Sequence, residues 1–213
     1  AICSSVSESS VTPVPAAALS NSDADLLEQM LVEWGQVTVE LDLDCGFDGN
    51  AMSHNVIGEF DGSGNSGRFV LLGAHLDSWD LGTGAADDGA GVAIVMAAAK
   101  RVAELPQRPH HGIRVVLFAN EEQGVYGGKA YASGHAEELD RHLIGAESDL
   151  GAGRIYQFRS RVRAGLEPTV GELAGWLAAL DITFNSDRPA GGGADVGEMV
   201  KLGMPAIDLN QDA

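Results

Sequence analysis

The stretch Leu71-Leu-Gly-Ala-His75-Leu-Asp77-Ser-Trp-Asp80, followed by Gly84-Ala-Ala-Asp87-Asp88-Gly-Ala-Gly91, decides the fold. A short apolar run ends in His-x-Asp, and a pair of aspartates then precedes a long alanine-rich segment. The apolar run is typical of a buried strand, and the alanine-rich segment is typical of a helix. The order therefore predicts a strand, a loop and a helix, with a histidine at the strand end and carboxylates at the helix start.

Strands and helices are expected to alternate along the rest of the chain. Further strands are expected at 113–119, 143–146, 154–159 and 205–209. Helices are expected at 88–105, 127–141, 168–180 and 194–202. Such alternation is typical of an α/β fold, in which helices cover both faces of a largely parallel or mixed sheet.

The N-terminal segment 1–50 is expected to be partly loose, with one helix and one strand. Ser20 is a good residue to begin the helix, and Gly35 is a good residue to end it. Apolar residues alternate with polar ones over 37–43, which predicts a half-exposed strand. Residues 51–213 are expected to form the catalytic domain.

Two apolar runs, 55–60 and 68–74, flank the glycine-rich stretch 61–67. Glycine clusters between apolar runs mark turns. We therefore expect the two runs to be strands joined by a hairpin or a long turn.

Composition excludes several classes of protein. The chain has 213 residues, 45% of them hydrophobic, and a net charge of -18. A surface this acidic repels phosphate backbones, so nucleic acid is not an expected partner. No run approaches the roughly 20 apolar residues of a membrane span, and no signal peptide is visible. Cys3 and Cys45 could pair or could both be free.

Acidic residues follow the ends of several apolar runs. His75, Glu121 and Asp149 each lie just past an expected strand, and Asp87 precedes an expected helix. Ligands in open α/β sheets bind beyond the carboxyl ends of the strands. The sequence therefore predicts that four separate elements bring these side chains to one rim of the sheet.

One histidine with several carboxylates is a ligand set that zinc accepts, and catalytic zinc sites keep one position open for water. Asp87 could bridge two metal ions, and Asp77 could hold the imidazole of His75 in the ligating tautomer. Of Glu121 and Glu122, one could ligate while its neighbour takes a proton from water.

Each motif alone has a simpler interpretation. An aspartate pair such as Asp87-Asp88 is more often a helix cap, and a glutamate pair is more often a solvated loop. Asp149 alone would be a turn residue. All four motifs occur in order, each at a strand end or a helix start, and this combination favours the metal site. His110, His111 and His135 are expected to be surface histidines.

The ordered motifs at 73–77, 86–91, 120–122 and 147–149 closely resemble those of the co-catalytic di-zinc exopeptidases, which include aminopeptidases and glutamate carboxypeptidases. The first two motifs look most like the plasma glutamate carboxypeptidase branch. The resemblance implies a three-layer α/β/α sandwich with a mixed, mostly parallel central sheet. It also implies a short peptide substrate and a secreted or periplasmic location.

The resemblance implies a role for each site residue. His75 and Asp149 would hold one zinc ion, Glu122 would hold the other, and Asp87 would bridge both. Glu121 would be the general base and Asp77 would orient His75. By the same resemblance, the glycine-rich loop that ends in Asp195 would lie near the pocket.

One departure from the family pattern concerns the second zinc ion. In the family, this ion takes a histidine from a motif soon after the last strand, and the chain stops at Ala213 before such a motif. We therefore expect the chain to be truncated at both ends, with two zinc ions in the complete protein.

The leading hypothesis is a zinc-dependent exopeptidase that hydrolyses dipeptides or short peptides through metal-activated water. One alternative is a glutaminyl-cyclase-like acyltransferase with one zinc ion. Another alternative is a non-catalytic binding domain of the same fold. The sequence leaves open whether amino or carboxyl termini are trimmed, and whether the protein forms a homodimer.

Overall fold

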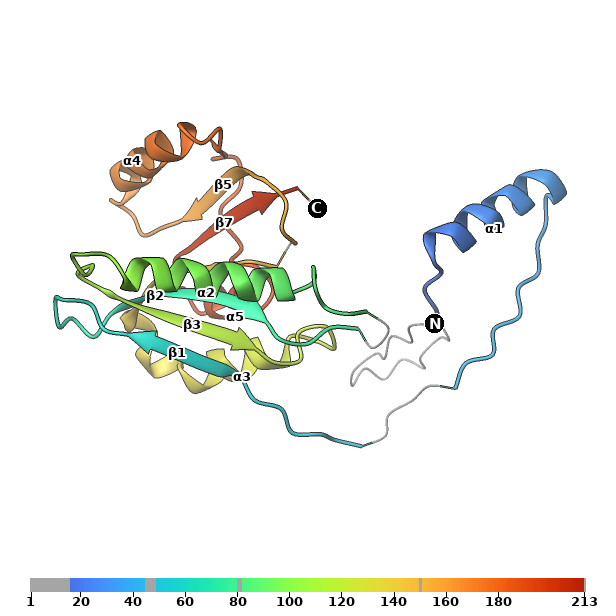
Figure 1. Cartoon of the computed structure of the whole chain (residues 1–213), viewed down its shortest axis with the longest axis horizontal. Helices are drawn as coiled ribbons and strands as arrows, with labels where there is room; N and C mark the ends of the chain where they lie inside the picture. The colour runs from blue at the N-terminus through green and yellow to red at the C-terminus, as the bar shows by residue number, and fades with distance from the viewer. Residues whose placement is uncertain (1–15, 45–48, 80–81, 150, 213) are drawn as a thin grey trace. The chain divides into compact units, whose positions relative to one another are not determined.

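The computed structural model describes residues 16–44, 49–79, 82–149 and 151–212 (Figure 1). The chain forms two compact units, 1–52 and 53–213, and each unit is described by itself. Cys3 and Cys45 lie outside the described residues, as does part of the segment 1–50 that was expected to be partly loose.

The N-terminal unit contains helix α1 (Asn21–Trp34). The Ser20 hydroxyl accepts a hydrogen bond from the Asp23 N–H, and Gly35 has a left-handed backbone with φ 72°. These are the expected start and stop. The strand predicted over 37–43 was wrong, because residues 36–44 form no strand. An alternating pattern supplies no hydrogen-bond partner, and the described part of this unit holds no second strand to pair with.

The larger unit contains a seven-stranded sheet in the order β1-β3-β2-β4-β7-β5-β6. Its strands are β1 (Val56–Phe60), β2 (Phe69–His75), β3 (Gly112–Phe118), β4 (His142–Glu147), β5 (Ile155–Arg161), β6 (Thr183–Phe184) and β7 (Ala206–Gln211). Its helices are α2 (Gly89–Ala103), α3 (Tyr126–Gly134), the 3-10 helix η1 (Ala136–Arg141), α4 (Glu167–Ala178) and α5 (Val196–Lys201). None of the described helices has the length and apolar character that a membrane crossing requires.

The sheet is mixed and mostly parallel, as expected. The four central strands β3, β2, β4 and β7 run parallel to one another, while β1 pairs antiparallel with β3 and β5 pairs antiparallel with β7. The two-residue strand β6, which the sequence did not predict, pairs parallel with β5.

The runs 55–60 and 68–74 form β1 and β2, as expected. Of the two expected connections, the hairpin is excluded, because β3 lies between these two strands. The glycine-rich turn packs against the loop before β3: the Ser63 N–H donates to the Pro109 carbonyl and the Gly64 N–H to the His110 carbonyl. At Gly62, a Cβ would lie 2.3 Å from the His110 carbonyl oxygen. This close approach accompanies the pairing of β1 with one edge of β3, while β2 pairs with the other edge.

Helices cover both faces of the sheet, which confirms the three-layer α/β/α fold. Alternate residues of the central strands point to opposite faces. On one face, Leu72 and Leu117 pack with Val95 of α2. On the other face, Leu71 and Phe118 pack with α3 and α5 (Figure 1). A separate cluster of Phe158, Val170 and Ile182 lies between β5 and α4.

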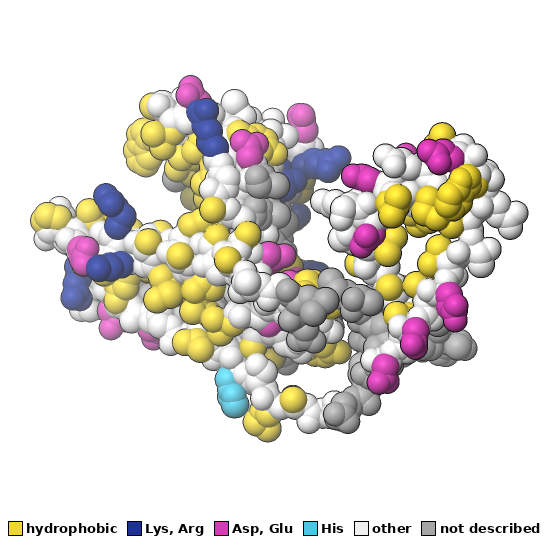
Figure 2. All heavy atoms as spheres, turned by 45° about the vertical axis from the view of Figure 1, so that its right-hand side comes forward, with side chains coloured by type: hydrophobic (Ala, Val, Ile, Leu, Met, Phe, Trp, Pro, Cys, Tyr) yellow, Lys and Arg dark blue, Asp and Glu magenta, His cyan; other side chains and the backbone are white. Residues whose placement is uncertain are grey.

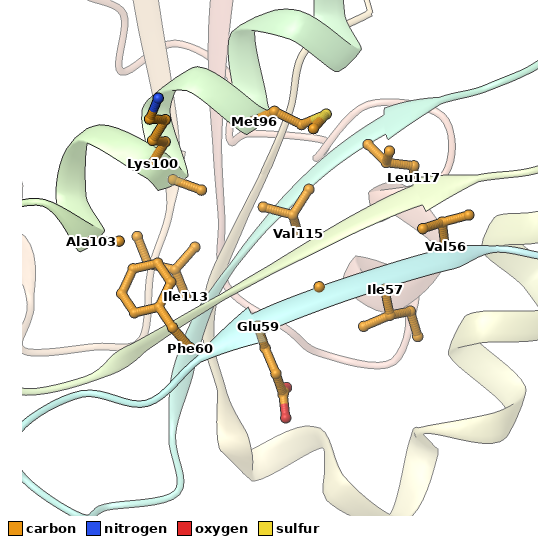
Figure 3. Close-up of a pocket in the computed structure, with 12 residues that line it drawn as sticks. Val56, Ile57, Glu59, Phe60, Met96, Lys100, Ala103, Ile113, Val115 and Leu117 are labelled. Atoms are coloured by element: carbon orange, nitrogen blue, oxygen red, sulfur yellow. The ribbon is translucent and has the colours of Figure 1, made fainter.

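An apolar hollow of about 300 Å³ lies beside α2 at the β1 edge of the sheet. Val56 and Phe60 of β1, Val115 of β3 and Met96 and Lys100 of α2 contribute to its lining (Figure 3). Figure 2 shows hydrophobic side chains at the molecular surface, in agreement with the high exposure of Val56 and Met96. None of the candidate metal ligands lines this hollow.

A chain of buried polar side chains joins the sheet to α3 and η1. Arg114 of β3 donates to the hydroxyl oxygen of Tyr131 at 3.1 Å, and that hydroxyl lies 2.9 Å from Nε2 of His142. Nδ1 of His142 lies 3.1 Å from the Glu138 carbonyl oxygen. The arrangement fits a neutral imidazole, with Nδ1–H donating to the carbonyl and Nε2 accepting from the tyrosine.

We predict that this network makes the domain less stable in mild acid. Burial, with smaller effects from Arg114 and His135, lowers the pKa of His142 from 6.5 to about 4. Between these pH values the unfolded chain binds a proton that the folded chain does not. The associated stability is therefore present above pH 6.5, and about 3 kcal/mol is lost as the pH falls to about 4. Urea unfolding of the wild type and of His142→Asn across this range measures the effect. The prediction is wrong if both proteins show the same change in unfolding free energy.

Candidate metal centre

The strand end that carries His75 is tied to the start of α2. The main-chain N–H of His75 donates to Oδ2 of Asp88 at 3.0 Å, and Oδ1 of Asp88 accepts from the Gly91 N–H at 3.1 Å. Asp88 is therefore the cap of α2 and an anchor for β2 at once. Because β2 lies between β3 and β4 and His75 is only 1% exposed, the imidazole has little freedom to move.

The imidazole of His75 lies between one carbonyl and two carboxylates. Its Nδ1 is 2.9 Å from the Asp77 carbonyl oxygen. Its Nε2 is 3.1 Å from Oδ1 of Asp87 and 3.1 Å from Oδ1 of Asp149, which follows β4. The ligand atoms of His75, Asp87 and Asp149 all lie within 4.8 Å of one another. The structure thus brings together three of the four predicted metal ligands.

This arrangement calls for a positive charge. When Nδ1–H donates to the Asp77 carbonyl, the lone pair of Nε2 faces two anionic oxygens, and a proton or a metal cation must lie between them. Burial by itself lowers the pKa of His75, but the hydrogen bond to Asp149 and the charges of Asp149, Asp88 and Glu121 outweigh burial and raise that pKa to about 10. One imidazole nitrogen with carboxylate oxygens is a donor set that suits zinc.

The loop that carries Glu121 and Glu122 is held by Asp77. The carboxylate of Asp77 accepts from the Glu121 N–H at 2.8 Å and from the Glu122 N–H at 3.1 Å. The carboxylate of Asp77 was expected to orient His75. Instead, the main-chain carbonyl of Asp77 makes the hydrogen bond to Nδ1 of His75. The carboxylate oxygen Oδ1 of Asp77 lies farther away, 3.7 Å from the same nitrogen. Asp77 therefore touches both parts of the site, the imidazole and the glutamate loop.

Glu122 does not belong to the three-residue cluster, yet its carboxylate borders it. Burial and then the charge of Asp87 raise the pKa of Glu122, and burial and then the charge of Asp149 raise the pKa of Glu121. Oε1 of Glu122 is buried and has no hydrogen-bond partner among the described residues. An unpartnered buried carboxylate oxygen beside Asp87 fits the expected fourth ligand.

Two further carboxylates lie next to this cluster. Glu147 accepts from the Asp195 N–H at 3.2 Å and from the Val196 N–H at 2.7 Å, and Asp195 accepts from the Gly128 N–H at 2.7 Å. Burial, with the charge of Asp195, raises the pKa of Glu147 to about 8. The sequence pointed to Asp195 only through its glycine-rich loop and gave Glu147 no separate role.

The other histidines that the sequence singled out lie elsewhere. His111 is 2.9 Å from the Ser66 hydroxyl and His110 packs edge-on against His111, in the loop before β3. His135 stacks on Tyr131 with ring centroids 4.0 Å apart. None of the three belongs to the cluster of potential ligands found among the described residues.

The fold and the site together define a metallopeptidase-type α/β domain. The model of Peptidase family M28 matches residues 55–213, and the chain belongs to this family. Bovine carboxypeptidase Q is 31% identical to the chain and human carboxypeptidase Q is 30% identical, each over 95% of the chain and 42% of the relative.

Solved structures agree with this family. The crystal structure of a peptidase M28 precursor from Shewanella amazonensis superposes with a TM-score of 0.87 at 49% identity, covering 96% of this chain and 46% of that chain. A zinc aminopeptidase from Bacillus subtilis shares the fold with a TM-score of 0.59 at 20% identity, covering 74% of this chain and 39% of that one. The chain thus spans less than half the length of these relatives.

We predict that Asp88→Asn destabilises the domain by about 1–3 kcal/mol, because an amide offers only one acceptor oxygen where two main-chain N–H groups now donate. Urea unfolding at neutral pH measures the loss. Glu172→Gln, an exposed change of the same kind on α4, is the control and should change stability by less than about 0.5 kcal/mol. Equal effects in the two variants would contradict the anchoring role of Asp88.

Proposed function

We propose that the chain is part of a zinc-dependent exopeptidase that hydrolyses dipeptides or short peptides. One observation carries the proposal: Nε2 of His75 lies 3.1 Å from two carboxylates, directly beside a glutamate loop that a third carboxylate holds. Membership of Peptidase family M28 and the similarity to carboxypeptidase Q support it. The compartment and the oligomeric state stay predictions.

The residues present fit a zinc ion. Nε2 of His75 and the carboxylate of Asp149 would hold it, together with Asp87, whose side chain is 66% exposed and could also reach a second ion. The unpartnered oxygen of Glu122 would serve that second ion. When bound, zinc supplies Lewis-acid chemistry, because it polarises a carbonyl and lowers the pKa of a nearby water.

The protein groups would perform the proton transfers. Glu121 would take a proton from the attacking water and return it to the leaving amine. Asp77 would keep Glu121 in place through the main-chain N–H of that residue. The Asp77 carbonyl would hold the proton of His75 on Nδ1, which leaves Nε2 free to ligate.

We predict that the intact protein retains at least one zinc ion per chain after dialysis, as measured by elemental analysis. His75→Ala should weaken zinc binding by about 100-fold or more, because even changes behind a ligand cost about 10- to 100-fold. His54→Ala, which alters an exposed histidine, is the control and should bind zinc as the wild type does. Equal zinc content in His75→Ala and the wild type would exclude the site.

We predict that Glu121→Gln keeps zinc and lowers kcat by about 100- to 10,000-fold, the usual contribution of a general base. Dipeptides and a peptide with an N-terminal glutamine are the substrates, and Glu172→Gln is the control. Turnover by Glu121→Gln near the wild-type rate would reject the general base. Cyclisation of the glutamine peptide without dipeptide hydrolysis would support the glutaminyl-cyclase alternative. If the wild type neither binds zinc nor turns over either substrate, the result would support the non-catalytic binding domain.

A further inference from the structure

The loop that carries the two glutamates is closed by a side chain from a distant part of the sequence. The loop leaves β3 at Ala119 and enters α3 at Gly127, and the Gly127 N–H donates to the Ala119 carbonyl at 2.9 Å. Asn55, which immediately precedes β1, completes the closure. Its Oδ1 accepts from the Ala119 N–H at 2.9 Å, and its Nδ2 donates to the Gly127 carbonyl at 2.9 Å. One amide thus connects the two ends of the loop.

The approach of Asn55 to this junction is too close for a side chain at 127. A Cβ on Gly127 would lie 2.5 Å from Oδ1 of Asn55 and 2.4 Å from the Ala119 carbonyl oxygen. Such distances lie far inside van der Waals contact. The glycine and the asparagine therefore depend on each other, and the junction is a defined packing arrangement.

The loop needs such ties because its backbone is unfavourable. Asn120 and Val125 both have φ of 59°, in the left-handed region that side chains disfavour, above all a β-branched one such as valine. Asp77 holds the N–H groups in the middle of the loop. Asp195 holds the Gly128 N–H at the start of α3. The Asn55 side chain joins the two ends, next to the main-chain hydrogen bond from Gly127 to Ala119.

We propose that Asn55 is a positioning residue that sets the place of Glu121 by holding the loop closed at Ala119 and Gly127. The inference rests on the proposed function, in which Glu121 moves the proton. The junction requires an amide side chain at position 55. One side-chain atom must accept from the Ala119 N–H, while the other donates to the Gly127 carbonyl. The simpler alternative is that Asn55 only stabilises the start of β1, in which case its loss would lower stability without a specific effect on the loop.

Hydrogen exchange of main-chain amides tests this directly and does not depend on activity. Asn55→Asp has the same shape and keeps the acceptor for the Ala119 N–H, but it places an oxygen against the Gly127 carbonyl. Exchange over 119–128 should become at least about tenfold faster, while β2 and β4 stay protected. Val170→Ala, in the separate cluster between β5 and α4, is the control for a general loss of stability and should leave 119–128 protected. Unchanged exchange over 119–128 in Asn55→Asp, or an equal increase across the sheet, would overturn the proposal.

Steady-state kinetics of the intact protein give the second readout. Asn55→Asp should lower kcat by about 10- to 100-fold, because a shift of about 1 Å in a catalytic group costs roughly this much. KM should change less than about threefold, and Val170→Ala should keep both constants per folded molecule. A wild-type kcat in Asn55→Asp would overturn the role of Asn55. If the wild type hydrolyses no peptide, the proposed exopeptidase function fails, and the exchange pattern still decides whether Asn55 holds the loop.

Discussion

The site depends on one buried imidazole that faces more negative charge than it can neutralise alone. Asp88 holds the main-chain N–H of His75, and the Asp77 carbonyl holds Nδ1 of its imidazole. Nε2 therefore cannot turn away from the carboxylates of Asp87 and Asp149. Carboxylates held this close repel one another. A cation bound between them, as proposed above, would remove that repulsion. The position of β2 in the middle of the sheet makes this arrangement rigid.

The sequence predicted that His75, Asp87 and Asp149 lie together, because these residues follow strongly apolar runs or precede a helix. The burial of β2, β3 and β4 is visible as hydrophobic runs, and parallel strands end at one edge of the sheet. His75, Asp87 and Asp149 could therefore be placed together before any geometry was known. Local signals also sufficed for α1, where Ser20 and Gly35 act through hydrogen bonds to residues within one turn.

Features that depend on contacts between distant segments could not be predicted in this way. The pairing of β1 with β3 is set by the turn at 61–67 lying on the loop at 109–111, and a glycine-rich turn looks the same whichever strand it delivers. The alternation over 37–43 suggested a strand, but alternation describes which side chains are polar and does not supply a pairing strand. Asn55 carried no signal at all, since a single asparagine before an apolar run is ordinary in any sequence.

The glutamate loop shows why such distant contacts matter for a reaction. Under the proposed function, Glu121 is a general base that must not shift by even an ångström, yet loops are the least constrained parts of an α/β fold. Here the strained residues Asn120 and Val125 would relax if the loop were free. Asn55, Asp77 and Asp195 come from three different regions of the chain, and their ties to main-chain groups oppose that relaxation. Rigidity of the loop is therefore a property of the whole sheet domain, not of the loop sequence.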